Sequence, residues 1–180
     1  MQSYDELYSQ LLNWHFARHK FSGNNTPSAA SEFFLTCLAN QILLPVAQYF
    51  GQVSITYGFT SPALTRYVQR LSPAGSAPDL DQHACCELNT KNSPICKRQG
   101  AACDFVVKGY EENMHVVAQY IGQQLSFDKL YFYGRNRPIH ISVSDKPLRH
   151  VQIMQQSEST RRYPGKKAFG DNAIALLKEL

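Results

Sequence analysis

The sequence predicts an α+β fold. Residues 3–20 carry apolar side chains at helical spacing, and residues 53–59 alternate between apolar and small or polar side chains, as a half-buried strand does. Two further strand patterns, at 129–133 and 139–143, follow each other closely near the end of the chain. Strands that are separated by helices at unequal spacing, and that end in hairpin-like neighbours, favour α+β over a regular βαβ repeat.

The helices are predicted from their caps and their apolar periodicity. Ser3 and Glu6 have the form of a capping box at the start of the first helix. The second helix is expected to be interrupted or re-initiated at Pro45 and to end at Gly51. The expected ranges are 3–20, 32–49, 61–71, a helix starting at 111 or 113 and ending near 125, and a final short helix at 172–180.

The strands are predicted from alternation. Besides the ranges above, a short strand is expected at 105–107, with Asp104 at its start. In the strand at 139–143, His140 lies on the polar face, where a cleft would be. Residues 84–98 show no clean period and are interpreted as an inserted loop.

Length and composition set the limits for the whole chain. The 180 residues, 43% of them hydrophobic, suit a single domain spanning 1–180. We expect no membrane span and no secretory start, and therefore a cytoplasmic protein. The net charge of +4 includes a basic stretch near the C-terminus, but no nucleic-acid-binding motif accompanies it, so we expect no nucleic-acid partner.

Three separated residues offer a set of metal ligands. His83, Asp104 and His140 supply two imidazoles and one carboxylate. Zinc binds both donor types, and a site with three protein ligands leaves a fourth position for water, which the metal acidifies. The sequence therefore predicts a Zn²⁺ site.

The same residues lie within a pattern that resembles the M15 peptidases, the zinc D-Ala-D-Ala carboxypeptidases and phage endolysins that share the fold of the hedgehog N-terminal domain. The similarity begins in the run from Leu43 to Arg66 and continues at His83, at the Gly-x-Ala-x-Asp element of residues 100–104 and at His140. The resemblance implies that His83, Asp104 and His140 bind the metal. It also implies a small antiparallel sheet flanked by helices, and a peptide-like or peptidoglycan-like ligand.

The resemblance divides the chain into an N-terminal helix at 1–30, a zinc core at 31–145 and a C-terminal extension at 146–180. Two of the family's catalytic groups are not matched. Residues 57–61 read Tyr-Gly-Phe-Thr-Ser where the family has an arginine, and Tyr133 stands at the place of its catalytic glutamate. Tyr133 and Arg137 are therefore the candidate catalytic residues, Tyr133 as a hydroxyl donor in the cleft and Arg137 as a replacement for the missing arginine.

Several interpretations remain open at the level of the sequence. A divergent peptidase or amidase would need another proton carrier, for which Asp81, Glu87 and His150 are candidates, and Arg66 and Arg135 are further substitutes for the arginine. A degenerate member of the family would bind zinc and a ligand without cleavage. In a third interpretation, His83 forms a structural zinc site with the nearby cysteines, which are Cys85, Cys86, Cys96 and Cys103.

Overall fold

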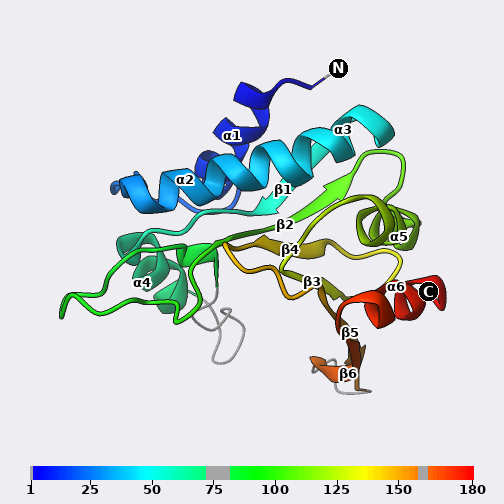
Figure 1. Ribbon diagram of the computed structural model, residues 1–180. Helices are drawn as coiled ribbons and strands as arrows, with labels where there is room; N and C mark the ends of the chain where they lie inside the picture. Colours follow the sequence, from blue (N-terminus) through cyan, green and yellow to red (C-terminus); the bar gives the residue numbers. More distant parts are fainter. Residues whose placement is uncertain (1, 72–81, 158–161) are drawn as a thin grey trace.

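The computed structural model describes residues 2–71, 82–157 and 162–180, and shows an α+β fold with helices and a six-stranded mixed sheet (Figure 1). The sheet has the order β1-β2-β4-β3-β5-β6. Its strands are β1 (Val53–Tyr57), β2 (Ala101–Val107), β4 (Ile139–Val143), β3 (Lys129–Phe132), β5 (His150–Gln156) and β6 (Arg162–Ala168).

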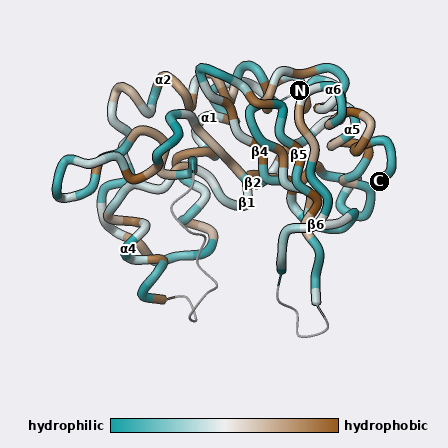
Figure 2. Tube along the Cα trace, turned by 60° about the horizontal axis from the view of Figure 1, so that its bottom comes forward, coloured by the Kyte–Doolittle hydropathy of each residue, from teal (hydrophilic) through white to brown (hydrophobic). Residues whose placement is uncertain are grey.

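The resemblance implied an antiparallel sheet, but the sheet is mixed. β3 pairs with β5 in parallel, while the other neighbouring strands run antiparallel. β5 and β6 both come from residues 146–180, so this segment completes the sheet at one edge. The far ends of β5 and β6 extend away from the rest of the structure and are largely hydrophilic (Figure 2).

Alternate strand residues face the helices and form the core. Phe105, Leu130, Ile141 and Val151 belong to one cluster of buried side chains that also includes residues of the helices. These helices are α1 (Tyr4–Asn13), α2 (Ala29–Leu38), α3 (Leu44–Phe50), α5 (Met114–Gln124) and α6 (Asp171–Lys178). The strand residues between the core residues point to the other face of the sheet, which carries polar side chains such as Asp104 and His140.

The first helix is shorter than predicted. The capping box of Ser3 and Glu6 is present, but α1 ends at Asn13 and continues as the 3₁₀ turn η1 (Trp14–Ala17). A smaller apolar cluster packs Trp14 against Leu64 and Val68 of α4 (Pro62–Leu71). This cluster joins α4 to the edge of the sheet near β1.

The second predicted helix is continuous from Ala29 to Phe50, because α2 passes into α3 through the π-helical turn η2 (Ala39–Leu43). The turn directly precedes Pro45, which is where the sequence predicted an interruption. By length and composition alone this helix could cross a membrane, which the sequence analysis did not expect. Its buried residues, among them Leu35, Leu38 and Ile42, belong to the main core.

Strand β2 is longer than predicted. It begins at Ala101, so Asp104 lies in its middle instead of at its start. The 3₁₀ turn η3 (Gln82–Ala84) leads into the predicted inserted loop at 84–98, which contains a hairpin in which Leu88 pairs with Pro94. The helices α4, α5 and α6 and the strands β3 and β4 agree with their predicted ranges to within a few residues.

Candidate metal centre

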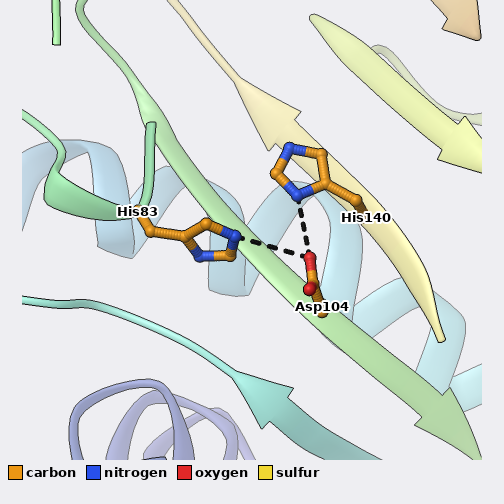
Figure 3. Close-up of side chains that lie close together, drawn as sticks. All are labelled: His83, Asp104 and His140. Atoms are coloured by element: carbon orange, nitrogen blue, oxygen red, sulfur yellow. Dashed lines mark hydrogen bonds and ion pairs between the residues drawn. The ribbon is translucent and has the colours of Figure 1, made fainter. Parts of the chain in front are cut away.

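His83, Asp104 and His140 lie together (Figure 3). Asp104 lies on β2 and His140 lies directly opposite it on β4, while His83 comes from η3. Nδ1 of His140 is 2.8 Å from Oδ1 of Asp104, and Nε2 of His83 is 3.4 Å from the same oxygen. One ligand atom from each residue lies within 4.8 Å of the other two.

The cluster belongs to a row of side chains that runs across the sheet. The strand register pairs Tyr57 with Asp104, Asp104 with His140, His140 with Tyr131, and Tyr131 with Gln152. An irregularity in β1 between Ile55 and Tyr57 places Tyr57 at the end of this row. Bulges of this kind redirect a side chain next to a site, so β1 contributes to the geometry around Asp104.

Aromatic rings hold the two imidazoles in place. The ring of Tyr131 stacks on His140, with centroids 4.9 Å apart and planes 21° apart. Tyr57 packs edge-on against His83 at 4.6 Å, and Trp14 in turn lies 4.0 Å from Tyr57. The indole nitrogen of Trp14 donates to the carbonyl of Phe59 at 2.8 Å, which fixes this outer ring.

His83 is positioned by its backbone. Its carbonyl accepts a hydrogen bond from the N–H of Thr60 at 3.0 Å, which ties η3 to the segment after β1. Gly100, just before β2, allows the backbone to lie close to β4 and to Gln82, the residue before His83. Its φ of 153° and its lack of a side chain allow close approach to the carbonyl oxygen of Val143 and the amide of Gln82. The glycine of the Gly-x-Ala-x-Asp element therefore has a steric role next to His83.

The two histidines are buried and the carboxylate is partly open. His83 and His140 are 3% and 4% exposed, while the side chain of Asp104 is 29% exposed. Burial by itself would raise the pKa of Asp104, but hydrogen bonds from His140 and His83 outweigh it and hold the pKa well below its usual value. Asp104 is therefore a carboxylate at neutral pH, as a metal ligand must be.

The donor set fits a metal ion. Around a tetrahedral zinc, ligand atoms about 2 Å from the metal lie roughly 3.3 Å from one another. The two distances to Oδ1 of Asp104, 2.8 Å and 3.4 Å, are close to that spacing. His83, Asp104 and His140 could therefore hold a metal ion.

The cysteines do not join this group. In the part of the chain that the structure describes, the donors close enough to share an ion are His83, Asp104 and His140, and no thiol is among them. Cys103 belongs to the main core and is fully buried, since adjacent strand positions face opposite ways and its neighbour Asp104 faces the site. The alternative of a structural zinc site formed by His83 and cysteines therefore finds no support in the described residues.

The two candidate catalytic residues lie near the end of β3 and in the turn that follows it. Tyr133 comes just after β3 instead of within it, and the guanidinium of Arg162 lies 4.9 Å from the centre of its ring. Arg137 is exposed in the turn between β3 and β4, where its N–H donates to the carbonyl of Gly134. The tyrosine that stacks on His140 is Tyr131, two positions earlier.

The possible substitutes for the family's catalytic groups have other contacts. Glu87 accepts hydrogen bonds from the backbone of Ser28 and the hydroxyl of Ser31 at the start of α2. His150 stacks on Phe169 at 4.4 Å and also lies edge-on to Tyr131, the ring beside His140, at 6.0 Å. Arg135 binds the carbonyl of Leu180. Arg66 lies on α4, and Asp81 falls outside the described residues.

Tyr57, Tyr131 and Gln152 are the members of the row that sequence reasoning did not single out for the site. Each lies on a strand, but their proximity follows from the order of the strands in the sheet, which alternation along one strand does not reveal. Comparison of the chain with protein-family models, with curated proteins and with solved structures gave no match.

Proposed function

We propose that this chain is a zinc-binding domain of the M15 peptidase type, and that it hydrolyses an amide bond in a peptide-like or peptidoglycan-like ligand. The observation that carries the proposal is the convergence of His83, Asp104 and His140 from η3, β2 and β4. The order of these residues and the Gly-x-Ala-x-Asp element agree with the M15 pattern.

The chemistry of a bound zinc suits this use. A zinc ion with three protein ligands acidifies a water at its fourth position and polarises a carbonyl. The chain supplies a ligand set of overall charge −1, because Asp104 is ionised and neutral imidazoles are the metal-binding form of histidine. The partial exposure of Asp104 gives the site one side that a ligand can reach.

Tyr57 and Tyr131 line the row on either side of Asp104 and His140. Their rings orient the histidines, and ring orientation sets the direction of the metal-binding nitrogen. Such support is expected of a site whose ligands must keep a fixed geometry during a reaction.

A second candidate function is zinc-dependent recognition without cleavage. It is favoured by the contacts of Glu87, which accepts hydrogen bonds from Ser28 and Ser31 at the start of α2, and by the tyrosine at position 133. A general base contributes about 100- to 10,000-fold to rate, so a chain without one would bind its ligand and turn it over very slowly.

The test begins with metal content. Protein purified without a chelator or a histidine tag is analysed by mass spectrometry for zinc and for iron, since iron(II) also accepts two histidines and a carboxylate. We expect about one zinc per chain in the parent and in His115→Ala, a histidine on α5 outside the cluster, and little metal in His140→Ala. Zinc retained by a folded His140→Ala variant would falsify the ligand assignment.

The second part of the test separates the two functions. The zinc-loaded parent and His140→Ala are incubated with D-Ala-containing peptides and with peptidoglycan fragments, and the products are followed by mass spectrometry. Cleavage by the parent alone supports the hydrolase. Saturable, zinc-dependent binding without products supports the recognition module, and neither binding nor cleavage contradicts both.

A further inference from the structure

An open pocket lies between α3 and α5, on the side of the sheet that the helices cover. Its volume of about 590 Å³ is within the range of roughly 300 to 1,000 Å³ that small-molecule sites have. Asp104 and His140 alternate with core residues along their strands and therefore point to the other side of the sheet. The pocket is thus separate from the candidate metal centre.

Three aromatic side chains line the pocket. They are Tyr49 and Phe50 at the end of α3 and Tyr120 on α5. The rings of Tyr49 and Tyr120 are stacked, with centroids 4.5 Å apart and planes 25° apart, and Phe50 meets Tyr120 edge-on at 5.2 Å. Tyr110 in turn contacts Phe50 edge-on at 4.9 Å. Each ring is therefore held by a neighbour, so a ligand would not have to order it.

The ring of Tyr49 is held in place and yet open to solvent. Tyr49 is 69% exposed, whereas Phe50 and Tyr120 are partly buried. Because Tyr120 stacks on one face of this ring, the high exposure leaves the other face accessible. The pocket therefore presents a fixed aromatic surface on which a ligand can stack.

Glutamine side chains supply the polar groups of the pocket, and they are Gln119, Gln123 and Gln124 of α5. Nε2 of Gln119 donates to the carbonyl of Leu177 at 3.1 Å, which leaves its own carbonyl oxygen as an acceptor. Gln123 and Gln124 are exposed, and each carboxamide can both donate and accept hydrogen bonds. Among the described residues that line the pocket, none carries a charge.

This combination of groups matches a neutral sugar. A pyranose ring has faces of C–H groups, whose slightly positive hydrogens are attracted to the negative face of an aromatic ring. Its hydroxyl groups both donate and accept, as the carboxamides do. A charged ligand would meet no opposite charge in the lining. A proline-rich peptide would also stack on aromatic rings, but proline has no N–H to offer, so the carboxamide oxygens would stay unmatched.

We propose that the pocket between α3 and α5 is a binding site for a neutral oligosaccharide. One sugar ring stacks on Tyr49, and its hydroxyl groups form hydrogen bonds with the glutamine carboxamides of α5. The site needs neither a metal nor any reaction at the candidate metal centre. The inference is therefore independent of the proposed function.

The test is an NMR titration of the isotope-labelled full chain. The ligands are a tetrasaccharide of N-acetylglucosamine, a tetrasaccharide of glucose and, in parallel, a proline-rich peptide. We expect at least one tetrasaccharide to shift the backbone amide signals of residues 49–50 and 119–124 along a saturable curve, and the peptide to leave them unchanged. The response to each tetrasaccharide shows whether an N-acetyl group is required.

Two variants examine the contacts. Tyr49→Ala removes the stacking ring and should weaken binding roughly tenfold, while Gln123→Ala removes one carboxamide and should weaken it about fivefold. Because Tyr49 is largely exposed, Tyr49→Ala should keep the amide spectrum of the core. Phe33→Ala is the matched control and should bind as the parent does, since Phe33 is 63% exposed on the same continuous helix and does not line the pocket.

Four outcomes overturn the proposal. They are the lack of a saturable shift with either tetrasaccharide, shifts that lie outside the pocket, equal affinities of Tyr49→Ala and Phe33→Ala, and binding of the proline-rich peptide in place of the sugars.

Discussion

The carboxylate of Asp104 contacts both imidazoles of the cluster through one oxygen. It can do so because the β2–β4 register places it opposite His140, and because Gly100 allows the start of β2 to approach Val143 and Gln82 closely. A small residue at position 100 is thus a condition for the close approach of the start of β2 to Val143 on β4 and to Gln82 on η3.

Gly100→Ala tests this condition. Its methyl group would meet the carbonyl oxygen of Val143, which belongs to the backbone and cannot turn aside, so we expect a loss of about 1–3 kcal/mol in the free energy of unfolding. Gly109→Ala is the matched control, since Gly109 also has a positive φ (85°) but has open space around it. Urea denaturation compares the two, and equal losses would show that contact with Val143 is unimportant.

Sequence reasoning at this scale depended on residue chemistry. His83, Asp104 and His140 could be chosen because their types and order suit a metal, and the structure brings them together. Tyr133 was chosen over Tyr131 because it stands at the place of the family's catalytic glutamate, but the ring that stacks on His140 is that of Tyr131. His15 is buried in the 3₁₀ turn η1, although its spacing along the sequence would also suit an exposed helix face.

At the scale of elements, Asp128 joins three segments of the structure. It is fully buried just before β3, where it accepts hydrogen bonds from Nε of Arg98 at 2.7 Å and from the N–H of Leu148 at 3.0 Å. It therefore connects the hairpin after His83 with the segment that enters β5. The pKa of Asp128 is raised by burial but lowered more strongly by Arg98 and Leu148.

Asp128→Ala should lower the free energy of unfolding by about 3–5 kcal/mol, because it leaves the guanidinium of Arg98 without its carboxylate. The exposed pair of Lys166 and Glu179 offers a control, and Glu179→Ala should change stability by less than about 1 kcal/mol. Thermal or urea unfolding gives both values. Similar small effects for the two variants would mean that the Asp128 contacts add little to stability.

Most helices and strands could be predicted from apolar periodicity, from helix caps and from Pro and Gly residues, because these signals act over a few neighbouring residues. The capping box of α1 and the break before Pro45 are examples, although the break takes the form of a π-helical turn inside one helix. The parallel pairing of β3 with β5 is not encoded locally, because it depends on how segments distant along the chain pack together. For the same reason residues 146–180 were assigned to an extension, although they supply β5, β6 and α6.

For the whole molecule, one buried and two partly buried histidines predict acid sensitivity. Burial lowers the pKa values of His15, His115 and His150 below the ordinary value, so the unfolded chain binds protons more readily than the folded one. Stability should be constant well above pH 6.5 and fall as the pH drops through that value toward the lowered pKa values. Urea titrations of chelator-treated protein between pH 8 and 5 measure this, and unchanged stability across that range would contradict it.

The three candidate metal ligands lie far apart in the sequence, at positions 83, 104 and 140, and come together only when β2 and β4 have paired. An unfolded chain therefore has no site, and mass action makes any ion that binds there a stabiliser of the whole fold. Free metal at 100 times its dissociation constant would add about 2.7 kcal/mol to the free energy of unfolding. The supply of metal in the surroundings would then help to set how much of the protein is folded, and so how long each copy survives proteolysis.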